Sequence, residues 1–153
     1  MKKIDVIVAF KKVTPYSTLV SKAIGWYTKS DYYHVEIAVD KYWVSVFPEK
    51  GVELVEIEPL KGDWEYKKIE NVTLTEEQYN KIVDFLLAQE NKEYDFKGIF
   101  LSQFIKLRIE SKNKWFCSEL VSKLLQLMLV EGFISIDPAT QSPENVFKIL
   151  KDL

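Results

Sequence analysis

The stretch Phe116–Val130 constrains the fold most, because it is apolar on nearly every side of the helix that its spacing predicts. A helix without a polar face has nothing to present to water, so we expect it to be buried at the centre of the protein. Gly132 is expected to end it. A chain of 153 residues is long enough to bury one core of this kind. We therefore expect one domain over residues 1–153.

The other predicted elements are strands first and helices afterwards. Segments rich in β-branched residues predict five strands, over Ile4–Phe10, Tyr33–Val39, Tyr42–Phe47, Val52–Ile57 and Trp64–Val72. Turns are predicted at Asp40-Lys41 and at residues 48–51. Helices are predicted after the Thr14-Pro15 cap, after the capping box Thr75–Gln78, over Tyr94–Leu107 and after the Ser142-Pro143-Glu144 cap. The first of these carries apolar residues at helical spacing, at Leu19, Val20, Ala23, Ile24 and Tyr27. This order predicts an α+β fold in which an antiparallel sheet packs against the central helix.

Cys117 is the only cysteine, and it stands at the start of the predicted central helix. A helix N-terminus carries a partial positive charge that favours a thiolate, and its unpaired backbone N–H groups can receive an oxyanion. These are the needs of a nucleophilic cysteine. The alternative is an inert, buried cysteine that acts as a small apolar residue. A lone cysteine forms no internal disulfide and excludes a cysteine-rich zinc site.

His34 is the only histidine and lies two residues before Glu36 on a predicted strand. Their side chains share one face, while Val35, Ile37 and Val39 take the opposite face. A carboxylate beside an imidazole can orient it as a general base. The alternative is a solvent-facing pair on a half-exposed strand. Because the cysteine and the histidine are each unique, a catalytic pair would require them to meet in space.

Four stretches together resemble one known family. They are His34-Val35-Glu36-Ile37, Tyr94-Asp95-Phe96-Lys97-Gly98, Phe116-Cys117-Ser118-Glu119-Leu120-Val121 and Ser142-Pro143-Glu144-Asn145-Val146. They are similar to the circularly permuted NlpC-type papain-like cysteine amidases and peptidases, the YiiX-like group, in which the histidine strand precedes the cysteine helix. The resemblance covers nearly the whole chain. It implies a permuted papain-like fold and no cofactor.

The resemblance also implies roles for individual residues. Cys117 would be the nucleophile, His34 the general base and Glu36 the group that orients the imidazole. In relatives that are not permuted, the third polar group comes from the next strand, which here falls near Ser45. Glu119 is a further polar group near the cysteine, and we interpret it as a favourable charge for the helix dipole.

The resemblance predicts hydrolysis of an amide bond in a peptide, amide or lipid-like substrate, with cell-wall peptide as one candidate. Ester cleavage, or a lipid acyltransferase or thioesterase reaction, would share the same first steps. A non-catalytic papain-like binding or structural module is the alternative from another class. The tryptophans Trp26, Trp43, Trp64 and Trp115 could line a groove but are expected in the core or at its rim.

Net charge and hydropathy indicate which classes of partner and which cellular location to expect. The net charge of -2, from 21 basic and 23 acidic residues, gives no general attraction to nucleic acid. No apolar stretch is long enough for a membrane span or a signal peptide, so a cytoplasmic location is expected. A phage origin, in which lysis releases the enzyme, would reconcile that location with a cell-wall substrate.

Overall fold

A five-stranded antiparallel sheet forms the centre of the computed structural model, which describes residues 1–47, 51–89, 93–94, 114–115 and 117–153. The strand order is β5-β4-β3-β2-β6, with bounds β2 Val6–Lys12, β3 Tyr32–Val39, β4 Tyr42–Phe47, β5 Gly51–Glu56 and β6 Trp64–Ile69. Two short pairs flank it, antiparallel β1 (Lys2–Lys3) with β7 (Thr73–Leu74) and parallel β8 (Glu93–Tyr94) with β9 (Lys114–Trp115). The predicted antiparallel sheet is confirmed.

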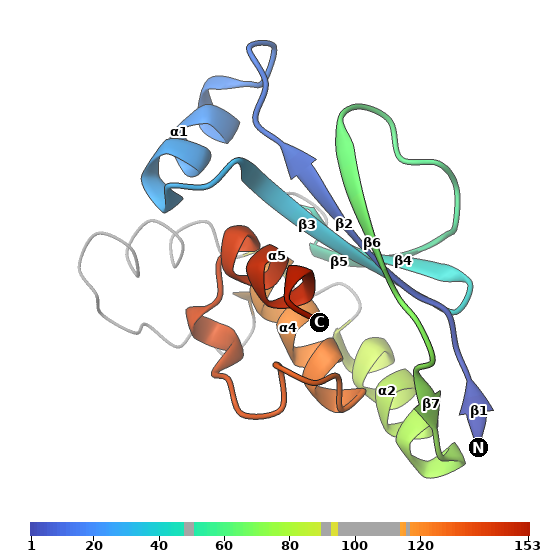
Figure 1. The fold of residues 1–153 in the computed structure, drawn as a ribbon. Coiled ribbons are helices and arrows are strands. Elements are labelled where there is room, and N and C mark those ends of the chain that lie inside the picture. The colour runs from blue at the N-terminus through green and yellow to red at the C-terminus, as the bar shows by residue number, and fades with distance from the viewer. Residues whose placement is uncertain (48–50, 90–92, 95–113, 116) are drawn as a thin grey trace.

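The described helices are α1 (Leu19–Thr28), α2 (Glu76–Gln89), α4 (Cys117–Leu127) and α5 (Pro143–Lys151), with a 3₁₀ turn η1 (Pro138–Thr140). In Figure 1, α4 and α5 lie across one face of the sheet, and α1 lies near the end where β3 begins. The α+β class is therefore confirmed. Of the helix expected over Tyr94–Leu107, Tyr94 belongs to β8, and residues 95–107 lie outside the described part. No helix in the described ranges has the length and hydropathy to cross a membrane.

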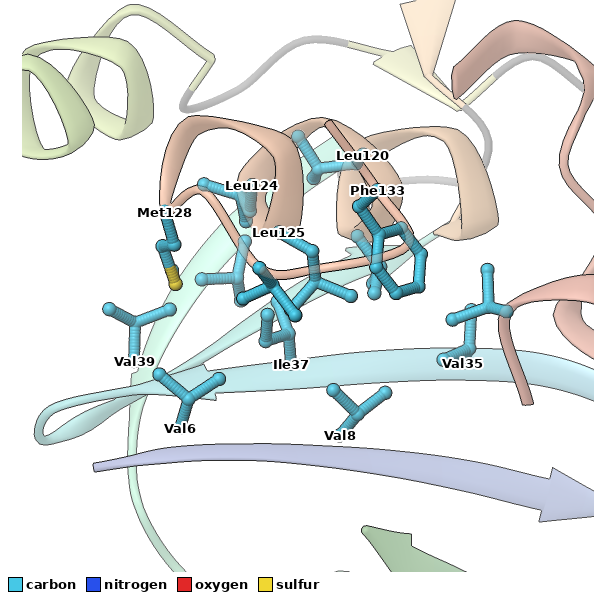
Figure 2. Close-up of a cluster of buried hydrophobic side chains, with 14 of the residues drawn as sticks. Val6, Val8, Val35, Ile37, Val39, Leu120, Leu124, Leu125, Met128 and Phe133 are labelled. Carbon is cyan, nitrogen blue, oxygen red and sulfur yellow. The ribbon is translucent and has the colours of Figure 1, made fainter. Parts of the chain in front are cut away.

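Helix α4 is the buried centre that its composition predicts. Figure 2 shows Leu124 and Leu125 of α4 on the side toward Ile37 and the valines of the sheet, and Leu120 belongs to the same buried cluster. Leu124 and Leu125 are fully buried, with 0% of their surface exposed. Each such side chain contributes about 2 kcal/mol relative to an exposed one. This packing holds the first residue of α4, Cys117, against the sheet.

The capping signals give a mixed result. The box before α2 forms as predicted, because Gln78 N–H donates to Thr75 Oγ1 (3.1 Å) and Thr75 N–H donates to Gln78 Oε1 (2.9 Å). Ser142 likewise caps α5. The prediction that Thr14-Pro15 caps α1 is wrong, since α1 begins at Leu19 and its cap is Thr18, whose Oγ1 accepts from Ser21 N–H. Thr14 N–H instead donates to Ser17 Oγ at 2.8 Å and closes a turn before the helix.

The expected apolar face of α1 is also corrected. Leu19 is 85% exposed and Ala23 is exposed, while the buried positions include Ser21 and Gly25. The reason is a close approach at Gly25, where a Cβ atom would lie 2.5 Å from Val13 Cγ2. Small residues therefore define the packed face. The side chains of Val20 and Tyr27 lie outside the described part.

Helix α4 ends before the expected Gly132. Leu129 takes the left-handed conformation (φ 56°), and its N–H donates to the Gln126 carbonyl. Val130 N–H donates to the Leu125 carbonyl, which completes a Schellman motif. Gly132 (φ 82°) lies in the turn that follows, where a Cβ atom would press on Ile149 of α5. The glycine thus permits close packing after the helix and does not terminate it.

Candidate active site

A bulge in β3 sets the direction of the His34 side chain. Lys11 of β2 pairs with His34 and Lys12 pairs with Tyr32, so Tyr33 is an extra residue in β3. The core side chains confirm it, because Tyr32 and Val35 both face the core although they are three positions apart. Bulges of this kind redirect side chains and are frequent beside active sites. Beyond the bulge, His34 shares the outer face of the sheet, away from α4, with Glu36.

Cys117 meets His34 at the edge of β3 that β4 leaves unpaired. Strand β4 pairs with β3 only from Ile37 to Val39, so the residues of β3 before Ile37 have no β4 partner on that side. The N-terminus of α4 lies at this edge, where the Val35 N–H hydrogen-bonds to Cys117. Cys117, on a helix that covers the core side of the sheet, can therefore reach His34, whose side chain belongs to the outer face.

The three residues predicted for the site lie together. The imidazole of His34 hydrogen-bonds to Cys117, and His34 Nε2 lies 3.1 Å from Glu36 Oε1. With Nε2 engaged by Glu36, Nδ1 is the ring nitrogen available to the sulfur. Glu36 is only 4% exposed and Cys117 only 3%. The alternative of a solvent-facing His–Glu pair is therefore wrong.

The other two candidate polar groups are Ser45 and Glu119. Ser45 is buried on β4, where its backbone pairs with Glu53 of β5. The carboxylate on the His34 ring comes from Glu36, and no described contact joins Ser45 to the ring. Glu119 is half-buried in the first turn of α4, the position in which a negative charge favours the helix dipole.

Opposing effects set the pKa of each member of the pair. Burial raises the pKa of the Cys117 thiol, but the His34 charge and hydrogen bond lower it, and so do the N–H groups of Val35 and Ser118. The net result is a pKa below the usual value of a thiol. Burial lowers the pKa of His34, but the Cys117 thiolate and then Glu36 raise it to about 10. Both directions favour a thiolate–imidazolium pair at neutral pH.

The outer face of the sheet is covered around Glu36 by the chain that follows β5. Trp43 Nε1–H donates to the Glu58 carbonyl at 3.1 Å, and Trp64 Nε1–H donates to the Lys61 carbonyl at 3.0 Å. The Trp64 ring also meets His34 edge-on, with centroids 6.0 Å apart. Glu36 Oε2 has no hydrogen-bond partner among the described residues. Its negative charge is thus held in a low-dielectric setting, where its attraction for the imidazolium is strong.

The tryptophan expectation holds in part. Trp43 is buried and Trp64 is half-buried at the rim, as expected, whereas Trp26 is 81% exposed. The side chain of Trp115 lies outside the described part.

Sequence reasoning missed the donor at Val35 and the bulge at Tyr33. A backbone N–H belongs to every residue type except proline, so no residue letter marks Val35 as a donor. The N–H of Ser118 could be anticipated, because it follows from placing Cys117 at a helix start. Within the described ranges, no group of three or more histidine, cysteine or acidic side chains is arranged to hold a metal ion. No protein-family model and no curated protein sequence matches the chain.

Proposed function

We propose that the chain is a cysteine hydrolase in which Cys117 is the nucleophile, His34 is the general base and acid, and Glu36 orients the imidazole. One observation carries the proposal: the only cysteine hydrogen-bonds to the only histidine, which a buried carboxylate holds from its other side. The pKa of Cys117 is lowered and that of His34 is raised, as an activated thiolate requires.

The proposed reaction begins with attack of the thiolate on a carbonyl carbon. A bond forms between Sγ and carbon, and the negative charge passes to the carbonyl oxygen, near the backbone N–H of Cys117. The bond to the leaving group then breaks, and His34 gives its proton to the leaving nitrogen or oxygen. In the second half, His34 takes a proton from water, the hydroxide attacks the thioester, and the acid leaves as the thiolate re-forms.

The arrangement of the elements also supports the permuted papain-like fold that the motifs imply. The histidine strand β3 precedes the cysteine helix α4 in the chain, and α4 packs against an antiparallel sheet. An amide bond is the proposed target, in a peptide or another amide. Esters and thioesters would react through the same acyl-enzyme.

The test uses the two unique residues as reporters. Thiolate absorbance near 240 nm, with Cys117→Ser as the blank, gives the pKa of the single thiol without any need for reagent access. We expect it to lie below the free value of about 8.5 in the parent protein and to be distinctly higher in His34→Ala, because burial then opposes only the two backbone N–H groups and no imidazolium.

Iodoacetamide alkylation and hydrolysis of an activated acyl ester complete the test. Both rates should fall sharply in His34→Ala, and ester hydrolysis should vanish in Cys117→Ser. A thiol that titrates identically in the parent and in His34→Ala would refute the catalytic pair. The non-catalytic module would then be the better interpretation.

A further inference from the structure

A lysine stands beside the proposed base and has no role in the mechanism above. Lys11 pairs directly with His34 across β2 and β3, and with Trp64 across β2 and β6. Side chains at directly paired positions share a face and lie next to each other. His34, Lys11 and Trp64 therefore form a row across the outer face of the sheet.

The Lys11 side chain is held in this row. Its Nζ lies 5.2 Å from the centroid of the Trp64 ring, and the same ring meets His34 edge-on at 6.0 Å. A Cβ atom on Gly62 would lie 3.8 Å from Lys11 Cε, so the lysine stem also runs past that glycine. Both Lys11 and Trp64 are half-buried. An ammonium group held on an aromatic face is more ordered than a free surface lysine.

Apart from the Trp64 ring, the described residues offer no partner that would neutralise the charge of Lys11. The neighbouring Lys12 pairs with Glu65 at 3.3 Å, but no carboxylate among the described residues forms an ion pair with Lys11. An ammonium group without a paired carboxylate in the described part suits the binding of a substrate anion.

The proposed proton transfer from His34 indicates which part of a substrate would lie near the Lys11 ammonium group. Because His34 protonates the leaving group, the leaving group must lie over the imidazole during acylation. Lys11 is the neighbour of His34 on β2, whereas Cys117 lies at the opposite edge of β3, beyond the part that pairs with β4. A group that extends from the leaving atom away from Cys117, across β3 toward β2, would therefore approach Lys11 and the Trp64 ring beside it.

We propose that Lys11 is a specificity residue that selects substrates carrying an anionic group on the leaving-group side. A carboxylate on a released amino acid and a phosphate on a released headgroup both have this chemistry. The inference rests on the proposed function, since it assigns the substrate class of the same site.

The experiment compares two acetate esters with nearly the same leaving group. One is 3-acetoxy-4-nitrobenzoic acid, whose leaving phenol carries a carboxylate, and the other is its methyl ester. In both, the bond from Sγ to the acetyl carbon forms, the bond to the phenolic oxygen breaks, and the nitrophenol is read by absorbance. We expect Lys11→Met to lower kcat/KM for the acid about five- to tenfold relative to the methyl ester, the effect of one partly screened charge.

Two further variants isolate the position of the charge. Lys11→Arg should retain the preference for the acid. Lys68→Met removes the same charge from the same face, because Lys68 pairs with Ile7 on the outer face but lies farther along the sheet from His34. It should leave the ratio of the two kcat/KM values unchanged. Added salt should reduce the ratio in the parent protein and have little effect in Lys11→Met.

Phosphate-bearing and carboxylate-bearing leaving groups are then compared in the parent protein to distinguish the two sources of the anion. Equal losses for the acid and the methyl ester in Lys11→Met, or an equal change of the ratio in Lys68→Met, would overturn the role of Lys11 and leave the proposed hydrolase intact. If the parent protein hydrolyses neither ester in a Cys117-dependent way, the proposed function fails and this inference fails with it.

Discussion

Replacing Glu36 by glutamine tests how much of the activation comes from the buried carboxylate. The change keeps the shape of the side chain and a hydrogen-bond acceptor near His34 Nε2, but it removes the negative charge 3.1 Å from the ring. A hydrogen bond to a charged group contributes about 1.5–3 kcal/mol, against about 1 kcal/mol for a neutral one. The substitution should therefore remove about 0.5–2 kcal/mol from the stabilisation of the imidazolium.

This loss converts directly into a change of pKa. Since one pKa unit corresponds to about 1.4 kcal/mol, the pKa of His34 should fall by roughly one unit from its raised value of about 10. The pKa of Cys117 should rise as the thiolate loses part of its partner's charge, because the two groups titrate together. We expect kcat/KM for an activated ester to fall about tenfold.

The single histidine makes the assay direct. The Hε1 resonance of His34 can be followed by NMR as a function of pH, and thiolate absorbance follows Cys117 in the same samples. Ser45→Ala is the matched control, because it changes the other residue considered for this role, and it should move neither titration. The reasoning would be refuted if Glu36→Gln left the His34 titration within about 0.3 units of the parent, or if Ser45→Ala shifted it equally.

The remaining predictions concern pH and stability. The ester hydrolysis rate should rise with pH through the lowered pKa of Cys117, because the thiolate forms there. It should fall again near pH 10, where the His34 imidazolium deprotonates. A rate that rises only above the usual thiol pKa of about 8.5 would contradict the ion pair. Leu129→Gly should stabilise the protein by about 1 kcal/mol in urea unfolding, since Leu129 is 56% exposed and holds a left-handed conformation that glycine adopts without strain. Leu129→Ala is its control, because alanine removes the side chain but keeps that strain, and equal stabilities of the two variants would refute the explanation.

Much of the local structure could be predicted from the sequence because its signals act over a few residues. The capping box at Thr75 and Gln78 and the cap at Ser142 form as expected, since each needs only hydrogen bonds within one turn. The burial of most of α4 followed from its apolar content, although Glu119, Lys123 and Gln126 form a half-buried polar stripe at helical spacing. The wrong apolar face predicted for α1 has a tertiary cause, because the close approach of Val13 to Gly25 decides which face packs.

By itself, the sequence determined the inventory of the candidate site: one cysteine at a helix start, and one histidine that shares a strand face with a carboxylate. It could not determine that these groups meet. That depends on the register of β4, which does not pair with the beginning of β3 where Cys117 lies, and on the bulge at Tyr33. It depends also on the burial of Glu36, and on the row that joins His34 to Lys11. Strand register and bulges arise from pairing between segments far apart in the chain, so only the tertiary structure decides them.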